Sequence, residues 1–275
     1  MGSPQLIPFS DASVRHRTFP YVNSALIGIS VLVFLYEMTL GGTGILTGRA
    51  GLGLNIFFLK WGFIASELTT GEPEIFRRAG LGIVSVETPV PTVLTIFTSL
   101  FIHGGFMHLA GNMAFLWVFG DNIEDRLGHV KYLVFYLLAG VAATLSQWAI
   151  NTDSTVPLIG ASGAISGVVG AYLMFYPYNK VKALLFLLIF ITVVEMRAIW
   201  LLGGWFVWQL VQGSLSLGLA DSVSVAFFAH IGGVVAGVVL AALYKLAVKE
   251  PLLLGSGCSG GNPWDYWYQA GRPRD

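Results

Sequence analysis

The chain has 275 residues, of which 55% are hydrophobic and 11% charged, with a formal net charge of zero. Soluble domains carry roughly 25% charged residues, so this composition argues against a soluble globular protein and predicts a polytopic membrane protein. The neutral balance gives no electrostatic basis for binding nucleic acid, and the single cysteine, Cys258, allows neither an intrachain disulfide nor a CxxC metal or redox site.

Six segments are predicted to cross a bilayer, for which a helix needs about 20 mostly apolar residues. They lie at 21–40, 93–119, 130–150, 162–176, 198–219 and 223–244. The residues before the first span are polar and lack a signal-peptide pattern. Between the first and second spans, the apolar and aromatic run 52–64 predicts a loop that is partly embedded in the membrane.

Lysine and arginine are distributed unevenly between the two sides of this arrangement. Eleven of the fifteen fall on the side that holds both chain ends, and the other four lie in the long first loop. The short loops that follow the third and fifth spans contain neither residue. Because positive charge is enriched in cytoplasmic loops, we expect both termini in the cytoplasm and these two loops outside.

The apolar segment from Val181 to Val194 could be mistaken for a seventh span. As a helix, about 14 residues would reach only about 21 Å, against a hydrocarbon core of about 30 Å. We therefore interpret the segment as interfacial or re-entrant on the cytoplasmic side. The interpretation matters because a crossing here would place Ser162 and His230 at opposite ends of their spans.

Two reactive side chains stand near the starts of apolar segments. Ser162 lies in the run Gly160-Ala161-Ser162-Gly163 at the fourth span, and His230 lies in the sixth. Reactive groups inside a membrane are energetically expensive and indicate function. A serine hydroxyl becomes a nucleophile when a base such as histidine takes its proton.

An anionic intermediate of such a reaction needs hydrogen-bond donors. His108 and Asn112 of the second span are four residues apart and therefore share one face of a helix. The backbone N–H of Ser162 is a further candidate, because the first N–H groups of a helix have no partner within it. His103 lies five residues before His108, at a different angle.

Small residues recur along the fourth and sixth spans, where they would let the two helices approach closely. The positions are Gly163, Gly167 and Gly170 in the fourth span, and Ala229, Gly233, Gly237 and Ala241 in the sixth. A direct hydrogen bond between serine and histidine requires this closeness.

Each residue also has a simpler interpretation. Ser162 alone could be a helix cap, and Ser166, one turn further, is the rival nucleophile. Without an HExxH pattern, the histidines give no case for zinc. Glu37, near the outer end of the first span, is interpreted as interfacial, and His129 as a solvated loop residue.

Taken together, the three motifs resemble the rhomboid family of intramembrane serine proteases. They are His103-x4-His108-x3-Asn112, Gly160-Ala161-Ser162-Gly163 and Ala229-His230-x2-Gly233-x3-Gly237, in the order and spans that the family uses. The run 119–128 is similar to bacterial-type members. Two positions depart from the family pattern. Leu94-Thr95 stand nearest to where many members have Trp-Arg, and Ser166 stands where some members place an aromatic residue against the base.

The resemblance implies a rhomboid-like bundle of six transmembrane helices with an embedded first loop. It implies a dyad of Ser162 as nucleophile and His230 as base, with His108 and Asn112 in the oxyanion hole. His103, Gly160 and Gly163 would support the site. Substrates would be single-span membrane proteins cleaved in or beside the span, without metal or other cofactor.

For this chain we expect a cytoplasmic segment at 1–19, the six-helix protease domain at 20–245 and a flexible cytoplasmic tail at 246–275. The expected location is a bacterial or archaeal cell membrane, with the active site opening outward. Two other functions stay open: a non-catalytic protein that binds client transmembrane helices, and a small transporter. The transporter ranks last, because the sequence shows neither an inverted repeat nor a pair of discontinuous helices.

Overall fold

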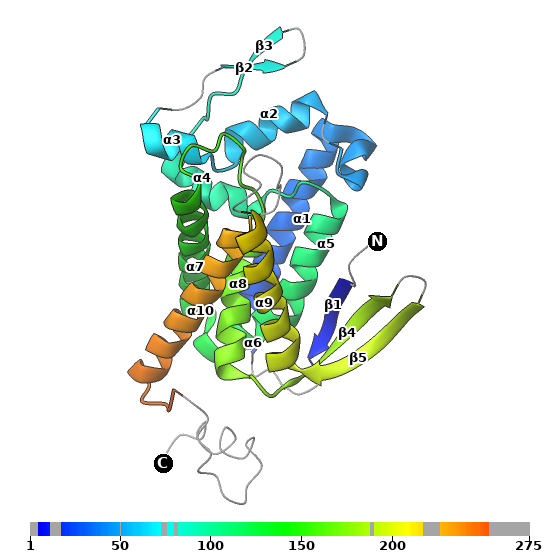
Figure 1. The fold of residues 1–275 in the computed structure, drawn as a ribbon, viewed down its shortest axis with the longest axis vertical. Helices are drawn as coiled ribbons and strands as arrows, with labels where there is room; N and C mark the ends of the chain where they lie inside the picture. The colour runs from blue at the N-terminus through cyan, green and yellow to red at the C-terminus, as the bar shows by residue number, and fades with distance from the viewer. Residues whose placement is uncertain are drawn as a thin grey trace, which may run out of the picture.

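The computed structural model describes residues 5–11, 18–49, 51–72, 76–79, 82–187, 190–216 and 226–252. Its helices form one bundle, with a small hairpin above one end and a three-stranded sheet beside the other (Figure 1). In chain order the elements are β1 (Gln5–Asp11), α1 (Tyr21–Gly41), the 3-10 helix η1 (Gly42–Thr47), α2 (Leu52–Trp61), α3 (Ala65–Thr70), β2 (Phe76–Ala79), β3 (Gly82–Ser85), α4 (Thr92–Thr98), the 3-10 helix η2 (Ser99–Phe101), α5 (Phe106–Phe115), the π-helix η3 (Leu116–Gly120), α6 (Asp121–Leu127), α7 (His129–Ile150), α8 (Ser162–Phe175), β4 (Lys180–Leu187), β5 (Phe190–Arg197), α9 (Ala198–Ser216) and α10 (Phe227–Ala247).

Within the described residues, three helical stretches are long and apolar enough to cross a membrane. They are Tyr21–Thr47, His129–Ile150 and Phe227–Ala247, and the bent pair Thr92–Phe101 and Phe106–Leu127 makes a fourth if it counts as one span. Helix α8 is apolar but has only 14 residues. The structure is therefore that of a mostly helical membrane protein, with three or four spans recognisable by length and composition.

The second predicted span, 93–119, is wrong as a single helix. The chain bends by 85° between Phe101 and Phe106. Gly104 and Gly105 stand in the break, and glycine is a poor helix former because it loses the most backbone freedom on ordering. The backbone N–H of His103 donates to Glu37 Oε1 at 3.1 Å, so a side chain from α1 satisfies a donor at the break.

The segment from Val181 to Val194 forms a β-hairpin and not the helix that the length argument assumed, while its interfacial or re-entrant position stays a prediction. Strands β4 and β5 pair antiparallel from Lys180 opposite Arg197 to Leu187 opposite Phe190, and β1 adds a third strand alongside β4. The run is rich in Val, Ile, Leu and Phe, and β-branched and aromatic residues of this kind favour strands. Because Ala198 N–H donates to the Asn179 carbonyl at 2.8 Å, the chain enters α9 at the end where it leaves α8.

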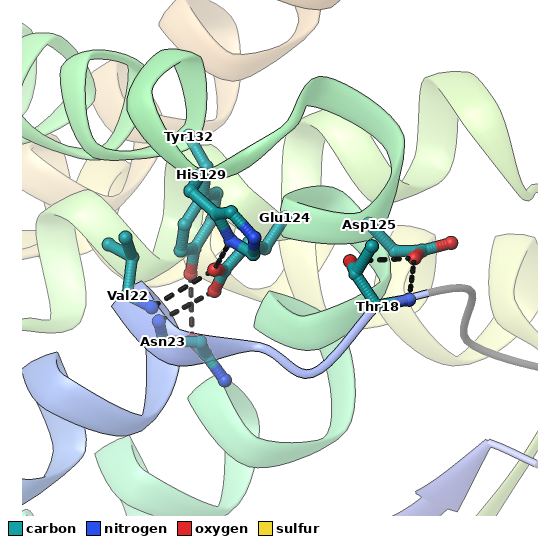
Figure 2. A network of polar contacts seen from close by, with 7 residues as sticks. All are labelled: Thr18, Val22, Asn23, Glu124, Asp125, His129 and Tyr132. Atoms are coloured by element: carbon teal, nitrogen blue, oxygen red, sulfur yellow. Dashed lines mark hydrogen bonds and ion pairs between the residues drawn. The ribbon is translucent and has the colours of Figure 1, made fainter.

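A buried carboxylate joins the start of α1 to α6 and α7 (Figure 2). Glu124 accepts the backbone N–H groups of Val22 and Asn23 at 2.9 and 2.7 Å, and its Oε1 lies 2.5 Å from His129 Nδ1. The Tyr132 hydroxyl donates to Asn23 Oδ1 at 2.8 Å. His129 is thus paired with a carboxylate, which corrects its interpretation as a merely solvated loop residue. The first N–H groups of a helix lack partners within it, and here a carboxylate supplies them.

Candidate active site

Ser162 and His230 meet across the interface of α8 and α10. Helix α8 begins at Ser162, and His230 lies in the first turn of α10. The Ser162 Oγ atom is 2.8 Å from His230 Nε2, within hydrogen-bond range for a nucleophile and its base. Both side chains are partly accessible. The arrangement can therefore transfer the hydroxyl proton to the imidazole.

Glycine contact between α8 and α10 makes this distance possible. A Cβ atom on Gly233 would collide with the carbonyl oxygen of Gly163, and one on Gly237 would collide with that of Gly167. Gly163 also packs toward α7, where an added Cβ would lie 2.7 Å from Ala143 Cβ. The predicted close approach of the two small-residue ridges is confirmed, since backbone meets backbone here.

Gly160 leaves room for His108 beside the serine. Its φ of +119° lies in the left-handed region that favours glycine, and an added Cβ would be 2.8 Å from His108 Nε2. The same Cβ position is 3.8 Å from Ser162 Oγ. One point of the α7–α8 loop thus lies within 4 Å of both the imidazole and the hydroxyl.

Asn112 follows His108 by one turn on α5. Its side chain is buried, and among the described residues its Nδ2 has no hydrogen-bond partner. A buried donor without a partner is costly, so the Asn112 Nδ2 group is available to donate to a polar group that enters the site. Such donors, aimed at a developing negative charge, form oxyanion holes.

His103 lies behind His108, where the two rings meet edge to face with centroids 5.2 Å apart. It is fully buried, and its Nδ1 lies 3.1 Å from the Phe101 carbonyl oxygen. Glu37 accepts the backbone N–H of His103 and is also fully buried, so its interpretation as an interfacial residue is wrong.

Ser166, the rival nucleophile, directs its hydroxyl to the backbone of its own helix. Its hydroxyl donates to the Ser162 carbonyl at 2.6 Å, and its side chain is 1% exposed. Serine commonly bonds the carbonyl four residues back in a helix. The Ser166 hydroxyl therefore hydrogen-bonds within α8.

Two residues of α9 that were not singled out from the sequence contact the His230 imidazole. His230 Nδ1 lies 2.9 Å from Gln209 Oε1, and the Trp205 ring lies 6.0 Å from the His230 ring at an interplanar angle of 38°. The signal for both was a polar residue within an apolar span, four positions after a tryptophan and thus on the same helix face. A third residue, Gln147 of α7, accepts the Ala229 N–H at 3.2 Å, beside the base.

No three His, Cys, Asp or Glu side chains gather closely enough to hold a metal ion in the parts of the chain that the structure describes. The residues that meet at the site are a serine, histidines and amides, a set suited to acyl transfer.

The family model described as "Rhomboid domain" matches residues 91–246, which is more than half of the chain. The chain belongs to the rhomboid family. The matched region of this rhomboid contains both residues of the Ser162–His230 pair, together with His108, Asn112 and Gln209. It begins after α1, so Glu37 lies outside the matched region, whereas its partner His103 lies inside.

Relatives of this rhomboid occur in plants, fungi and bacteria. Rhomboid-like protein 11, chloroplastic, of Arabidopsis thaliana is 30% identical over 60% of this chain and 57% of its own length. Rhomboid protein 1, mitochondrial, of Saccharomyces cerevisiae is 29% identical over 58% of this chain and 44% of its own. Rhomboid protease GluP of Bacillus subtilis is 37% identical over 28% of this chain and 15% of its own. The chain thus spans about half the length of the first two.

Proposed function

We propose that this rhomboid is an intramembrane serine endopeptidase that cleaves membrane-anchored proteins within or beside a transmembrane segment. The 2.8 Å contact between Ser162 Oγ and His230 Nε2 is the observation that carries the proposal. The name of its relative GluP, a rhomboid protease, supports it.

In the proposed reaction, His230 Nε2 takes the Ser162 hydroxyl proton as Oγ attacks the carbonyl carbon of the scissile peptide bond. The tetrahedral intermediate collapses when the C–N bond breaks and the imidazolium gives its proton to the leaving nitrogen. Water then attacks the ester on Ser162, again with His230 as base, and releases the acid product and the free hydroxyl.

The oxyanion of that intermediate is assigned to three donors: His108, Asn112 and the Ser162 backbone N–H. The α8 start supports the last, because the first N–H groups of a helix lack internal partners. The others are supported by the position of His108 beside Gly160 and by the Asn112 Nδ2 group, which has no partner within the described part of the chain. His103, Gly160 and Gly163 are proposed to hold these groups in place.

The proposed membrane arrangement has six spans within a protease domain at 20–245, flanked by cytoplasmic segments at 1–19 and 246–275. The other three spans are then the bent pair Thr92–Phe101 and Phe106–Leu127, the 14-residue α8 and the 19-residue α9. The aromatic part of the tail lies outside the described residues. We further propose single-span membrane proteins as substrates, a bacterial or archaeal cell membrane as the location, and a site that opens to the outside.

The test is cleavage of a model single-span substrate by the purified protein in detergent. Ser162→Ala and His230→Ala are each expected to abolish cleavage, and Asn112→Ala to reduce it by about 10²–10³, the usual cost of one oxyanion donor. Ser166→Ala is the matched control, one helical turn away, and should retain cleavage because its hydroxyl bonds the α8 backbone.

A fluorophosphonate probe separates the protease from a protein that merely binds client helices. Labelling of the wild type that is lost in Ser162→Ala supports the protease. Cleavage that survives in Ser162→Ala, or a folded wild type that neither reacts with the probe nor cleaves, contradicts the proposal.

A further inference from the structure

The imidazole of His230 has a polar neighbour on each side. Its Nε2 lies 2.8 Å from Ser162 Oγ on α8, and its Nδ1 lies 2.9 Å from Gln209 Oε1 on α9. Gln209 is 8% exposed, so water competes little for its amide. Three helices thus meet at one imidazole.

The two contacts together fix where the imidazole proton must be. A general base has to present a lone pair to the hydroxyl, so Nε2 is unprotonated before the reaction and the neutral ring carries its proton on Nδ1. The Nδ1–H group then donates to the Gln209 amide oxygen, which can only accept. When Nε2 gains the serine proton, the Gln209 oxygen still faces Nδ1–H and the partial positive charge there.

The geometry points to Gln209 as the positioning residue of the base, holding His230 in the tautomer and orientation that activate Ser162. This inference rests on the proposed protease function and adds a third member to the pair. Gln209 touches neither substrate nor nucleophile in this role and acts through the imidazole.

The neighbourhood of His230 contains few other groups that could orient it. Trp205 contacts the ring from one turn earlier on α9, and Gln147 binds the backbone of the residue before it. His108 of α5 is a titratable residue on the other side of the pair, where it lies with Ser162 beside Gly160. Among these described neighbours, Gln209 supplies the side-chain acceptor at Nδ1.

The test compares Gln209→Leu and Gln209→Glu with a matched control, Gln212→Leu, which makes the same substitution three residues along α9. Removing the acceptor in Gln209→Leu is expected to lower kcat about tenfold, the worth of one internal hydrogen bond, with KM nearly unchanged. Gln209→Glu keeps an acceptor oxygen at the same reach and should recover most of kcat. Its carboxylate also favours the protonated imidazole, so the acidic limb of the cleavage profile should move to higher pH.

A second measurement does not depend on cleavage. The protein labelled with 15N-histidine is examined by NMR in detergent, and the His230→Ala spectrum identifies the His230 signals. We expect protonated Nδ1 and unprotonated Nε2 in the wild type and in Gln212→Leu. Gln209→Leu should show a mixture of the two tautomers.

The outcomes separate this inference from the protease proposal. If the wild type does not cleave but its His230 tautomer depends on Gln209, the protease proposal fails and the positioning role stands. If the tautomer is the same in Gln209→Leu and Gln212→Leu, or the two variants share one kcat, the positioning role is overturned. A loss of stability alone would not move the pH limb in Gln209→Glu.

Discussion

At the scale of single residues, the site depends on glycines as much as on the residues whose side chains take part in it. Gly160 combines a φ of +119° with a position where a methyl group would lie 2.8 Å from the His108 imidazole. An L-residue there would strain the loop and push His108 away from the serine. The glycine is thus part of the arrangement that brings His108 and Ser162 together.

Gly160→Ala is therefore expected to impair cleavage more than it impairs folding. The strained φ should cost about 1–3 kcal/mol of stability, while displacement of His108 should lower kcat by at least about tenfold if that imidazole is an oxyanion donor. Thermal unfolding and cleavage kinetics measure the two effects separately. Gly204→Ala on α9 is the control, since nothing lies within 4 Å of a Cβ there. Equal kcat in both variants would contradict the role of Gly160.

The sequence predicted Ser162 and His230 because reactive groups in apolar spans stand out against their surroundings. It could not predict the Gln209 contact, because the span holds two glutamines, Gln209 and Gln212, and neither indicates which helix it faces. Glu37 was misread for a related reason. Its place near the end of the first span suggested the interface, whereas the bend of the α4–α5 segment brings the His103 N–H to it.

At the scale of elements, spacing was more informative than length. The small residues of the fourth and sixth spans predicted the α8–α10 contact because a four-residue repeat keeps one helix face. Length and hydropathy failed where the chain departs from a straight helix. A pair of glycines breaks the second span. The segment from Val181 to Val194 pairs with itself as β4 and β5, and β4 also pairs with β1 near the N-terminus. Apolar runs of this length do not separate helix from strand.

The α8–α10 contact gives a prediction about the whole site. In Gly237→Ala, the new methyl group would collide with the Gly167 carbonyl oxygen, so the helices must separate. We expect a loss of about 1–3 kcal/mol of stability and slower cleavage, because the Ser162–His230 distance grows as the helices part. Thermal unfolding and initial rates measure this. Gly28→Ala on α1 makes the same change where a Cβ meets nothing, and it should match the wild type; if Gly237→Ala also does, close backbone contact is not required.

At the scale of the whole molecule, the structure has a basic end and an end that holds the site. Helix α8 runs from Ser162 toward the β4–β5 hairpin, so the hairpin lies at the end of α8 opposite the serine. The N-terminal strand β1 pairs with β4, and Lys245 of α10 donates to the Met174 carbonyl at the same end of α8. An ion pair between Arg126 and Glu250 also lies near the α10 end. The last residue of β1, Asp11, pairs with Val181 next to Lys180 and Arg197, and the last turn of α10 lies at this same end of α8.

The position of these basic residues bears on the orientation of the protein in the membrane. Positive side chains stay preferentially in the cytoplasm, so the hairpin end should face inward and the Ser162 end outward. The contact between Asn179 and Ala198 holds the two ends of the hairpin together, so the segment from Val181 to Val194 should return to the side of the membrane from which it starts. Helices α8 and α10 then keep Ser162 and His230 at one end of the bundle. The inward position of the termini and the outward position of the α7–α8 loop are then one prediction.

Cysteine labelling in cells tests that prediction. Cys258 is the single natural cysteine, and its position lies outside the described residues. In intact bacterial spheroplasts, a membrane-impermeant maleimide should leave the wild type unlabelled and should label Thr155→Cys made in a Cys258→Ser background, because Thr155 is exposed in the α7–α8 loop. After permeabilisation, both proteins should react. Labelling of Cys258 in intact spheroplasts, with Thr155→Cys protected, would reverse the orientation, and with it the side from which a substrate's cleavage site meets Ser162.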